Sequence, residues 1–204
     1  MSEINLWEIE DGLYAEGITA ICGVDEAGRG PLAGPVCAAA VILPPHLELP
    51  GLNDSKKLTD KRRRELFPII KEQAIAYGIG FASEAEIDEI NILQATFLAM
   101  QRAIDQLNGQ AGFALIDGNR KKDFGLPVMT VVKGDSRSAN IAAASVLAKV
   151  SRDDLMLQMA ETYPQYGFDV HKGDGTKAHY EALRNHGPSP IHRMSFLKKF
   201  YESK

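Results

Sequence analysis

The sequence contains little cysteine, no long apolar run and no basic residue in its first twenty positions. Its two cysteines, Cys22 and Cys37, lack the spacing of metal ligands, and we interpret them as small buried hydrophobic residues. No apolar run approaches the roughly 20 residues of a membrane span. The start, MSEINLWEIEDG, is acidic where a signal peptide would be basic and then apolar. We therefore expect a cytoplasmic protein that does not bind membranes.

Length and charge indicate the domain organisation and the kind of partner. With 204 residues, 45% hydrophobic and 25% charged, the chain can bury a substantial core in one main domain with a small appendage. The net charge is −4, but its distribution is uneven, with acidic residues in the first twenty positions and at 84–89. Basic residues gather at 56–64, 120–122 and 172–199. Most such runs are solvated helix faces, whereas a basic face on an acidic protein could bind phosphates.

The order of elements predicts an α/β fold without internal repeats. We expect strands at 19–24, 36–43, 77–82, 113–117 and 128–132, the first of them ending at Asp25. Helices are expected at 59–76 with a kink at Pro68, from a capping box of Ser83 and Glu86 to Asn108, and at 138–163. After residue 163 the chain should be helical, with one helix capped at Thr176.

Acidic residues lie at or just beyond the ends of three expected strands. A lone aspartate there most often caps a helix or forms a turn. Asp25, Asp117 and Asp135 together would repel one another unless they were protonated or bound a multivalent cation. Oxygen ligands suit Mg²⁺ or Mn²⁺, and the lack of a matching Cys/His set argues against zinc.

Eight ordered blocks give the chain a specific resemblance. They are GVDEAGRGPLAGPV, LNDSKKL, IDEINILQAT, LIDGN, VVKGDSRSANIAAASVLAKVSRD, YPQYGF, HKGDGT and GPSPIHRMSF. Together they closely resemble bacterial ribonuclease HII from Cys22 to Phe196. The resemblance implies a ribonuclease-H-like mixed β-sheet flanked by helices, with a small helical C-terminal region. We expect an acidic extension at 1–18, a catalytic domain at 19–162 and a substrate-binding region at 163–204.

The resemblance also implies a reaction. The four acidic positions of the family fall on Asp25, Glu26, Asp117 and Asp135, which would bind two Mg²⁺ or Mn²⁺ ions. Such a site would hydrolyse the RNA strand of RNA–DNA hybrids and nick duplex DNA 5′ of single ribonucleotides, leaving 5′-phosphate and 3′-hydroxyl ends. We expect a monomer whose partners are these nucleic acids.

Substrate contacts follow from the same blocks. The Gly28, Arg29 and Gly30 segment would sense the ribose hydroxyl, because glycines let the backbone approach closely. Phosphate-backbone contacts are expected from Lys56, Lys57, Arg120, Lys133 and Ser138. Lys149 and Asp153 would support the site from a neighbouring helix, while His192 and Arg193 receive no role.

One block departs from the family pattern. Relatives are expected to carry Tyr, packed on a sugar at the DNA-side junction, where this chain has Asp174 in KGDGT. Loss of an aromatic platform would weaken junction recognition, although an Asp-Gly pair also suits a solvent-facing turn.

Rival functions remain at this point. A non-catalytic RNA- or hybrid-binding module would need basic and aromatic residues but not four metal-type acids. A sugar kinase or actin-like ATPase would need a duplicated domain or a phosphate loop ending in Lys-Ser/Thr, which the sequence lacks. A glycosidase could use paired carboxylates but gives no reason for Gly-Arg-Gly.

Overall fold

A five-stranded mixed sheet forms the centre of the molecule. A computed structural model describes residues 5–52 and 57–203 of the chain. The strands are β1 (Ile21–Ala27), β2 (Val36–Ile42), β3 (Ala76–Ala82), β4 (Phe113–Asp117) and β5 (Val128–Val131), in the order β3-β2-β1-β4-β5. β1 pairs antiparallel with β2 and parallel with β4, which places it at the centre of the sheet.

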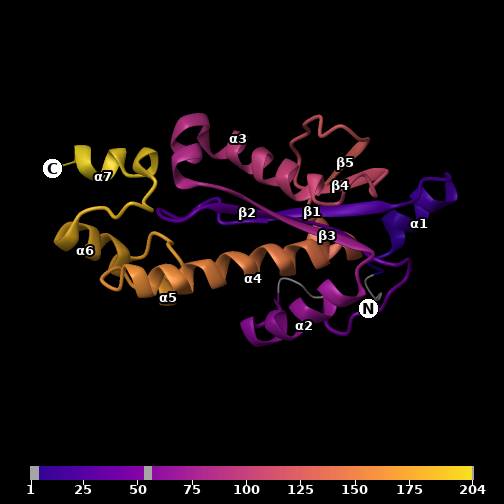
Figure 1. Cartoon of the computed structure of the whole chain (residues 1–204), viewed down its shortest axis with the longest axis horizontal. Coiled ribbons are helices and arrows are strands. Elements are labelled where there is room, and N and C mark those ends of the chain that lie inside the picture. Colours follow the sequence, from indigo (N-terminus) through magenta and orange to yellow (C-terminus); the bar gives the residue numbers. More distant parts are fainter. Residues whose placement is uncertain (1–4, 53–56, 204) are drawn as a thin grey trace.

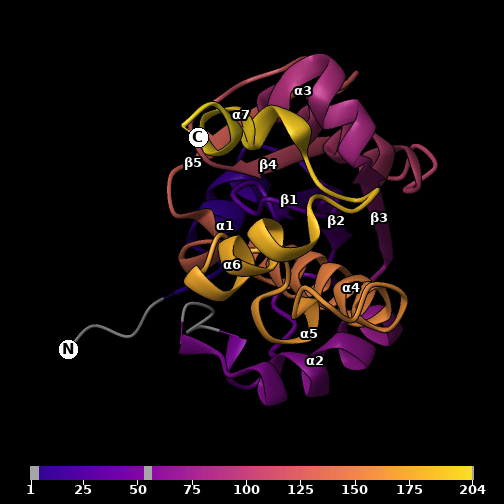
Figure 2. The same cartoon turned by 90° about the vertical axis from the view of Figure 1, so that its left-hand side faces the viewer.

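Helices cover both faces of this sheet (Figure 1). On one face lies α3 (Glu84–Asp105), and on the other lies α4 (Ala139–Thr162), with α2 (Asp60–Gln73) packed outside α4. The C-terminal region sits at one end of the sheet (Figure 2) and comprises α5 (Phe168–His171), α6 (Lys177–His186), a 3₁₀ turn, Met194–Phe196, and α7 (Lys198–Glu202). The expected mixed sheet between helices, followed by a helical C-terminal region, is confirmed.

Small apolar residues allow the layers to pack closely. All seven residues of β2 are buried, as expected for a strand covered on both faces. Cys22 and Cys37 are fully buried, unpaired thiols, which confirms their interpretation as core residues. Burial raises the pKa of each thiol to about 12, so both remain protonated at neutral pH.

Gly23 shows how closely β1 approaches α4. A Cβ atom added at this position would lie 2.1 Å from the backbone carbonyl carbon of Asn140 and from the backbone nitrogen of Ile141. Because backbone atoms cannot yield as a flexible side chain does, we expect Gly23→Ala to destabilise the protein by about 1–3 kcal/mol or more. Gly12→Ala is the matched control. It lies within a helix with no atom within 4 Å of its added Cβ, and it should stabilise by roughly 0.5–1 kcal/mol. Urea unfolding measures both changes, and an equal response would contradict the packing argument.

The first strand extends further than expected. It runs through both acidic residues to Ala27, with Asp25 paired to Ala39 and Glu26 to Ala38 of β2. The prediction that the strand stops at Asp25 was therefore wrong. Ladder pairing with β2 outweighs the poor strand propensity of the two acids, which the antiparallel neighbour accommodates with alanines.

The helix expected after Ser83 is interrupted. Its capping box is confirmed, since Ser83 Oγ accepts from Glu86 N and Glu86 Oε1 accepts from Ser83 N. At Asn91, however, φ is 72°, and the Asn91 side chain accepts from the backbone N–H of Gln94. Asn91 thus begins a second helical segment, and the prediction of one continuous helix was wrong. Asparagine tolerates this left-handed conformation and caps helices well.

The N-terminal segment contributes to the core. Leu6 and Trp7 pack into the cluster between the sheet and α4, and α1 (Glu8–Ala15) follows them. Glu10 is fully buried and accepts hydrogen bonds from Ser138 Oγ and from the Asn140 side chain. These contacts tie α1 to the start of α4. The division of the chain at residues 18 and 162 stays a prediction.

A search of the described residues for helices long and apolar enough to cross a membrane finds none.

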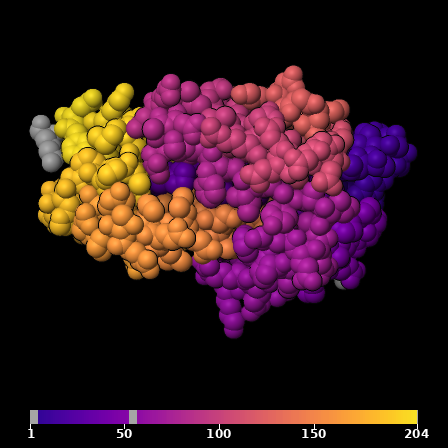
Figure 3. Space-filling model, in the orientation of Figure 1, coloured from indigo at the N-terminus to yellow at the C-terminus, as the bar shows by residue number. Residues whose placement is uncertain are grey.

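The C-terminal region is joined to the loop after β1 by backbone hydrogen bonds, from Leu32 N to Gly173 O and from Gly34 N to Ile191 O. Figure 3 shows indigo atoms from the first part of the chain framed between this region and α3. That hollow lies at the end of the sheet towards which β1 runs.

Candidate active site

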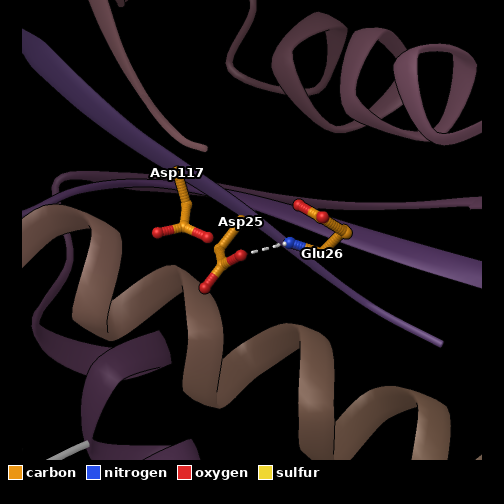
Figure 4. A group of neighbouring side chains, drawn as sticks. All are labelled: Asp25, Glu26 and Asp117. Atoms are coloured by element: carbon orange, nitrogen blue, oxygen red, sulfur yellow. Dashed lines mark hydrogen bonds between the residues drawn. The ribbon is translucent and has the colours of Figure 1, made fainter. Parts of the chain in front are cut away.

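Three carboxylates meet where β1 and β4 run side by side. Asp117 is the last residue of β4, and the register that pairs Val24 with Ile116 brings it next to Asp25. One carboxylate oxygen from each of Asp25, Glu26 and Asp117 lies within 4.8 Å of the other two. Figure 4 shows the three side chains next to one another. Asp25 and Asp117 therefore converge, as expected from the strand ends, and Glu26 joins them. That they bind metal ions stays a prediction.

Backbone N–H groups orient two of the carboxylates. The Glu26 N–H donates to Asp25 Oδ1 at 2.7 Å, as the dashed line in Figure 4 shows. The Gly134 N–H donates to Asp117 Oδ1, also at 2.7 Å. Gly134 begins a 3₁₀ turn, Gly134–Ser136, that carries Asp135. The fourth expected acid therefore lies beside the cluster, on a turn that the cluster itself helps to hold.

Burial and mutual repulsion oppose ionisation of the cluster. The pKa of Asp25 is raised well above its ordinary value, first by burial and then by the charges of Asp117 and Glu26. Burial, followed by the charge of Asp117, raises the pKa of Glu26. The pKa of Asp117 rises through burial and then through the charge of Asp135. The last effect shows that Asp135 acts electrostatically on the same site.

These residues fit a hard divalent cation. They offer only carboxylate oxygens, which Mg²⁺ and Mn²⁺ prefer. Glu26 Oε2 is buried and has no hydrogen-bond partner in the part of the chain that the structure describes. A buried acceptor without a partner is costly, and a cation would satisfy it while relieving the repulsion. Asp25, Glu26 and Asp117 would hold such an ion, with Asp135 beside them.

The raised pKa values make stability depend on pH with a definite sign. A carboxyl group whose pKa is higher in the folded state binds more protons there than when unfolded, so stability falls as pH rises from its unfolded pKa through its folded one. In EDTA, we expect Asp25→Asn and wild type to have similar free energies of unfolding near pH 4 and the variant to be more stable at pH 8. Urea unfolding at both values tests this. A variant less stable than wild type at pH 8 would contradict it.

An open cleft of about 400 Å³ lies against the cluster. Asp25, Glu26 and Asp135 line it together with the Gly28–Gly30 segment. Its other walls carry basic side chains and one further acid, namely Arg63, Lys149, Arg152, Lys172 and Asp174. A cleft with carboxylates at its base and cations around them can bind a polyanion and place one phosphate at the acids.

The two glycines of the Gly-Arg-Gly segment differ in their surroundings. Gly28 has φ of +92°, and a Cβ atom there would lie 2.0 Å from Arg152 Nε, so the fold itself requires glycine. Gly30 is exposed, and an added Cβ would meet no atom within 4 Å. Between them, the exposed Arg29 reaches Glu26 at 3.8 Å. Internal packing therefore explains Gly28 and leaves Gly30 open to a ligand.

The other predicted contact residues are scattered. Lys57, Arg120 and Lys133 are exposed, but none of them is among the residues that line the cleft. Ser138 is fully buried, donates to Glu10 and caps α4 by accepting from Ile141 N, so it presents no surface to a substrate. Lys56 lies outside the described residues.

Arg63 and Lys172, which line the cleft, were not singled out as substrate contacts from the sequence. Lys149, expected to support the site, also lines the cleft and forms an ion pair with Asp153 at 3.1 Å. Buried Arg152 and Arg193 hold the loop after β1. Arg152 stands in a run of ordinary polar and charged residues, and nothing in the short block around Arg193 indicates which backbone groups it contacts.

Known proteins resemble the chain over nearly its whole length. The family model described as Ribonuclease HII matches residues 22–199. The ribonuclease HII of Endomicrobium trichonymphae is 55% identical over 94% of this chain and 92% of its own. That of Syntrophotalea carbinolica is 56% identical over 92% of this chain and 90% of its own.

Solved structures agree with this fold. The ribonuclease H2 of Pyrococcus horikoshii OT3 superposes with a TM-score of 0.73 at 25% identity, covering 90% of this chain and 97% of that one. A chain of the PCNA:RNase HII complex from Archaeoglobus fulgidus gives 0.72 at 25% identity, covering 86% and 93%. With a family model matched over most of its length and relatives more than half identical, the chain belongs to the ribonuclease HII family.

Proposed function

We propose that this enzyme is a metal-dependent endoribonuclease that hydrolyses the RNA strand of RNA–DNA hybrids and nicks duplex DNA on the 5′ side of single embedded ribonucleotides. Membership of the ribonuclease HII family supports the substrate class and the nuclease activity. The observation that carries the chemistry is the cluster of Asp25, Glu26 and Asp117, of which Asp25 and Glu26 line a cleft with basic walls.

The chain's own residues define where hydrolysis would take place. When bound, two Mg²⁺ or Mn²⁺ ions would supply Lewis-acid activation of water and stabilise charge on the departing oxygen. Asp25 and Asp117, fixed on neighbouring strands by backbone N–H groups, would be the central ligands. Glu26 would add its unpartnered buried oxygen, and Asp135 would be the fourth ligand. Attack by water leaves a 5′ phosphate and a 3′ hydroxyl.

The cleft walls would orient the duplex. Arg29, Arg63, Lys149 and Lys172 surround the acids and could neutralise phosphates on either side of the scissile bond. The exposed backbone at Gly30 can approach a sugar closely, and the ribose 2′-hydroxyl is both a donor and an acceptor. Lys57, Arg120 and Lys133 would contact the duplex further from the cleavage site.

A single assay separates this proposal from its main rival. An RNA–DNA hybrid labelled on the RNA strand is incubated with the protein in Mg²⁺ and, in parallel, in EDTA, while binding is measured in both. We expect cleavage only with Mg²⁺ and binding in both. A non-catalytic hybrid-binding module would bind without cleaving under either condition. We further propose that the enzyme acts as a monomer, which sedimentation at assay concentration tests.

A further inference from the structure

Arg193 is a fully buried cation, with an exposed fraction of 0%. No carboxylate of the described residues forms an ion pair with it, although the charges of Glu84, Asp88 and Asp174 act on it from further away. Burial, followed by the positive charge of Arg152, lowers the pKa of Arg193 to about 9. Burying a charge away from water costs free energy that a hydrophobic residue of similar volume would not. The position of this guanidinium group therefore calls for a reason beyond packing.

Among residues 5–52 and 57–203, the hydrogen bonds of the Arg193 guanidinium all go to the backbone of one loop. We call this loop, Gly28–Pro35, the glycine loop. Nε donates to Gly34 O at 2.8 Å, and Nη1 donates to Arg29 O at 3.0 Å. Nη2 donates to Gly28 O at 2.6 Å and to Pro35 O at 3.1 Å. One rigid fork thus holds both ends of the loop, with Gly28 and Arg29 at its cleft side.

The backbone around Arg193 is anchored independently of its side chain. Arg193 N donates to Leu32 O, Gly34 N donates to Ile191 O, and a β-bridge joins Ala33 with His192. A change at the Arg193 side chain therefore leaves the C-terminal region attached to the loop. It removes the side-chain bonds to Gly34 and Pro35 and, with them, the contacts that reach back to Gly28 and Arg29.

We propose that Arg193 is a positioning residue that sets the ribose selectivity of the site by fixing the Gly28 and Arg29 backbone beside the acids. The inference rests on the function proposed above, in which this segment meets the 2′-hydroxyl. A misplacement of about 1 Å in such a contact can cost on the order of a hundredfold in rate. Arg152 assists from α4, since it donates to Ala33 O, Pro35 O and Lys172 O.

The test compares duplexes that carry one ribonucleotide or one 2′-fluoronucleotide, because fluorine cannot donate a hydrogen bond. Single-turnover rates are measured per folded enzyme at saturating Mg²⁺. The selectivity ratio is the rate on the ribonucleotide duplex divided by the rate on the 2′-fluoronucleotide duplex. We expect Arg193→Lys, which keeps the charge but loses the planar guanidinium fork, to lower this ratio about tenfold or more. Its affinity for the duplex should stay within about twofold of wild type, because the exposed cleft cations are unchanged.

Arg102→Lys is the matched control. It makes the same exchange at a half-exposed fork, which pairs with Glu86 on α3 and does not line the cleft, and it should leave the ratio unchanged. Gly30→Ala tests the sensor itself, since its Cβ meets no other atom. If Gly30→Ala leaves the ratio unchanged, the sensing role in the proposed function fails. If Gly30→Ala lowers the ratio and Arg193→Lys does not, the present inference fails alone.

If Arg193 only stabilised the fold, Arg193→Lys would lower the melting temperature and slow cleavage of both substrates equally, so that the ratio of the two rates would not change. Should Arg193→Lys not fold, Arg193→Gln, which buries no charge, is measured in the same way. A wild-type ratio in Arg193→Gln, or failure of both variants to fold, would overturn the assignment of a positioning role.

Discussion

Replacing Asp25 or Asp117 by asparagine lowers the cleavage rate on an RNA–DNA hybrid by about a hundredfold or more, while hybrid binding changes little. Asparagine keeps the size of each side chain but removes the negative charge that would hold the metal ions. Binding persists because it depends on the basic side chains of the cleft walls. Single-turnover cleavage at saturating Mg²⁺ and a parallel titration of hybrid in EDTA measure the two quantities.

Asp105→Asn provides the control for this prediction. Asp105 is exposed at the end of α3, where its carboxylate accepts from Gln101, and it lies outside the cluster. Its substitution should leave the rate within about twofold of wild type. If either Asp25→Asn or Asp117→Asn retained more than about a tenth of the rate, these residues would not be the central ligands.

Asp174→Tyr is expected to raise the cleavage rate on a single embedded ribonucleotide about tenfold or more, with a smaller gain on uniform hybrid. The resemblance places an aromatic residue at this position, and stacking is worth roughly 1–3 kcal/mol. Asp174 is exposed and lines the cleft, where a carboxylate repels phosphates. Its backbone groups are held by His171 O, Thr176 N and His179 Nδ1, so the side chain can change without loss of these bonds.

Both substrates are compared at equal salt and saturating Mg²⁺, with Asp169→Tyr as control. Asp169 is exposed in the same region but does not line the cleft, so a tyrosine there should not change the rate. Equal rates for wild type and Asp174→Tyr would contradict the prediction. Tyr180 would then be the candidate for the stacking role. Tyr166 is a poorer candidate, because it is buried and its hydroxyl donates to Gly187 O.

Local signals in the sequence were sufficient for most of the fold. Side-chain caps at Thr59, Ser83 and Thr176 begin helices where the sequence predicts them, because each cap depends on residues within one turn. The path of β1 through Asp25 and Glu26 depends on pairing with β2, which is a long-range contact. Strand propensity alone could not predict it.

In the site, too, the features that depend on local sequence could be predicted and those that depend on long-range contacts could not. Acidic residues stand out in short motifs, so the convergence of Asp25, Glu26 and Asp117 could be predicted. Ser138 lies in a motif that predicted a phosphate contact, but in the structure it caps α4 and donates to Glu10. Arg193 lies more than 150 residues from the loop that it holds, so only the tertiary structure reveals its contacts.

Cleavage mapping on a DNA duplex with one embedded ribonucleotide tests the central claim most directly. With Mg²⁺, the account predicts one nick on the 5′ side of that ribonucleotide, with a 5′ phosphate and a 3′ hydroxyl, and cleavage by Asp25→Asn that is slower by about a hundredfold or more. Cleavage that required four or more consecutive ribonucleotides, with none at a single one, would contradict the proposed specificity. Binding of both substrates without Mg²⁺-dependent cleavage of either would contradict the assignment of Asp25, Glu26 and Asp117 as the active site.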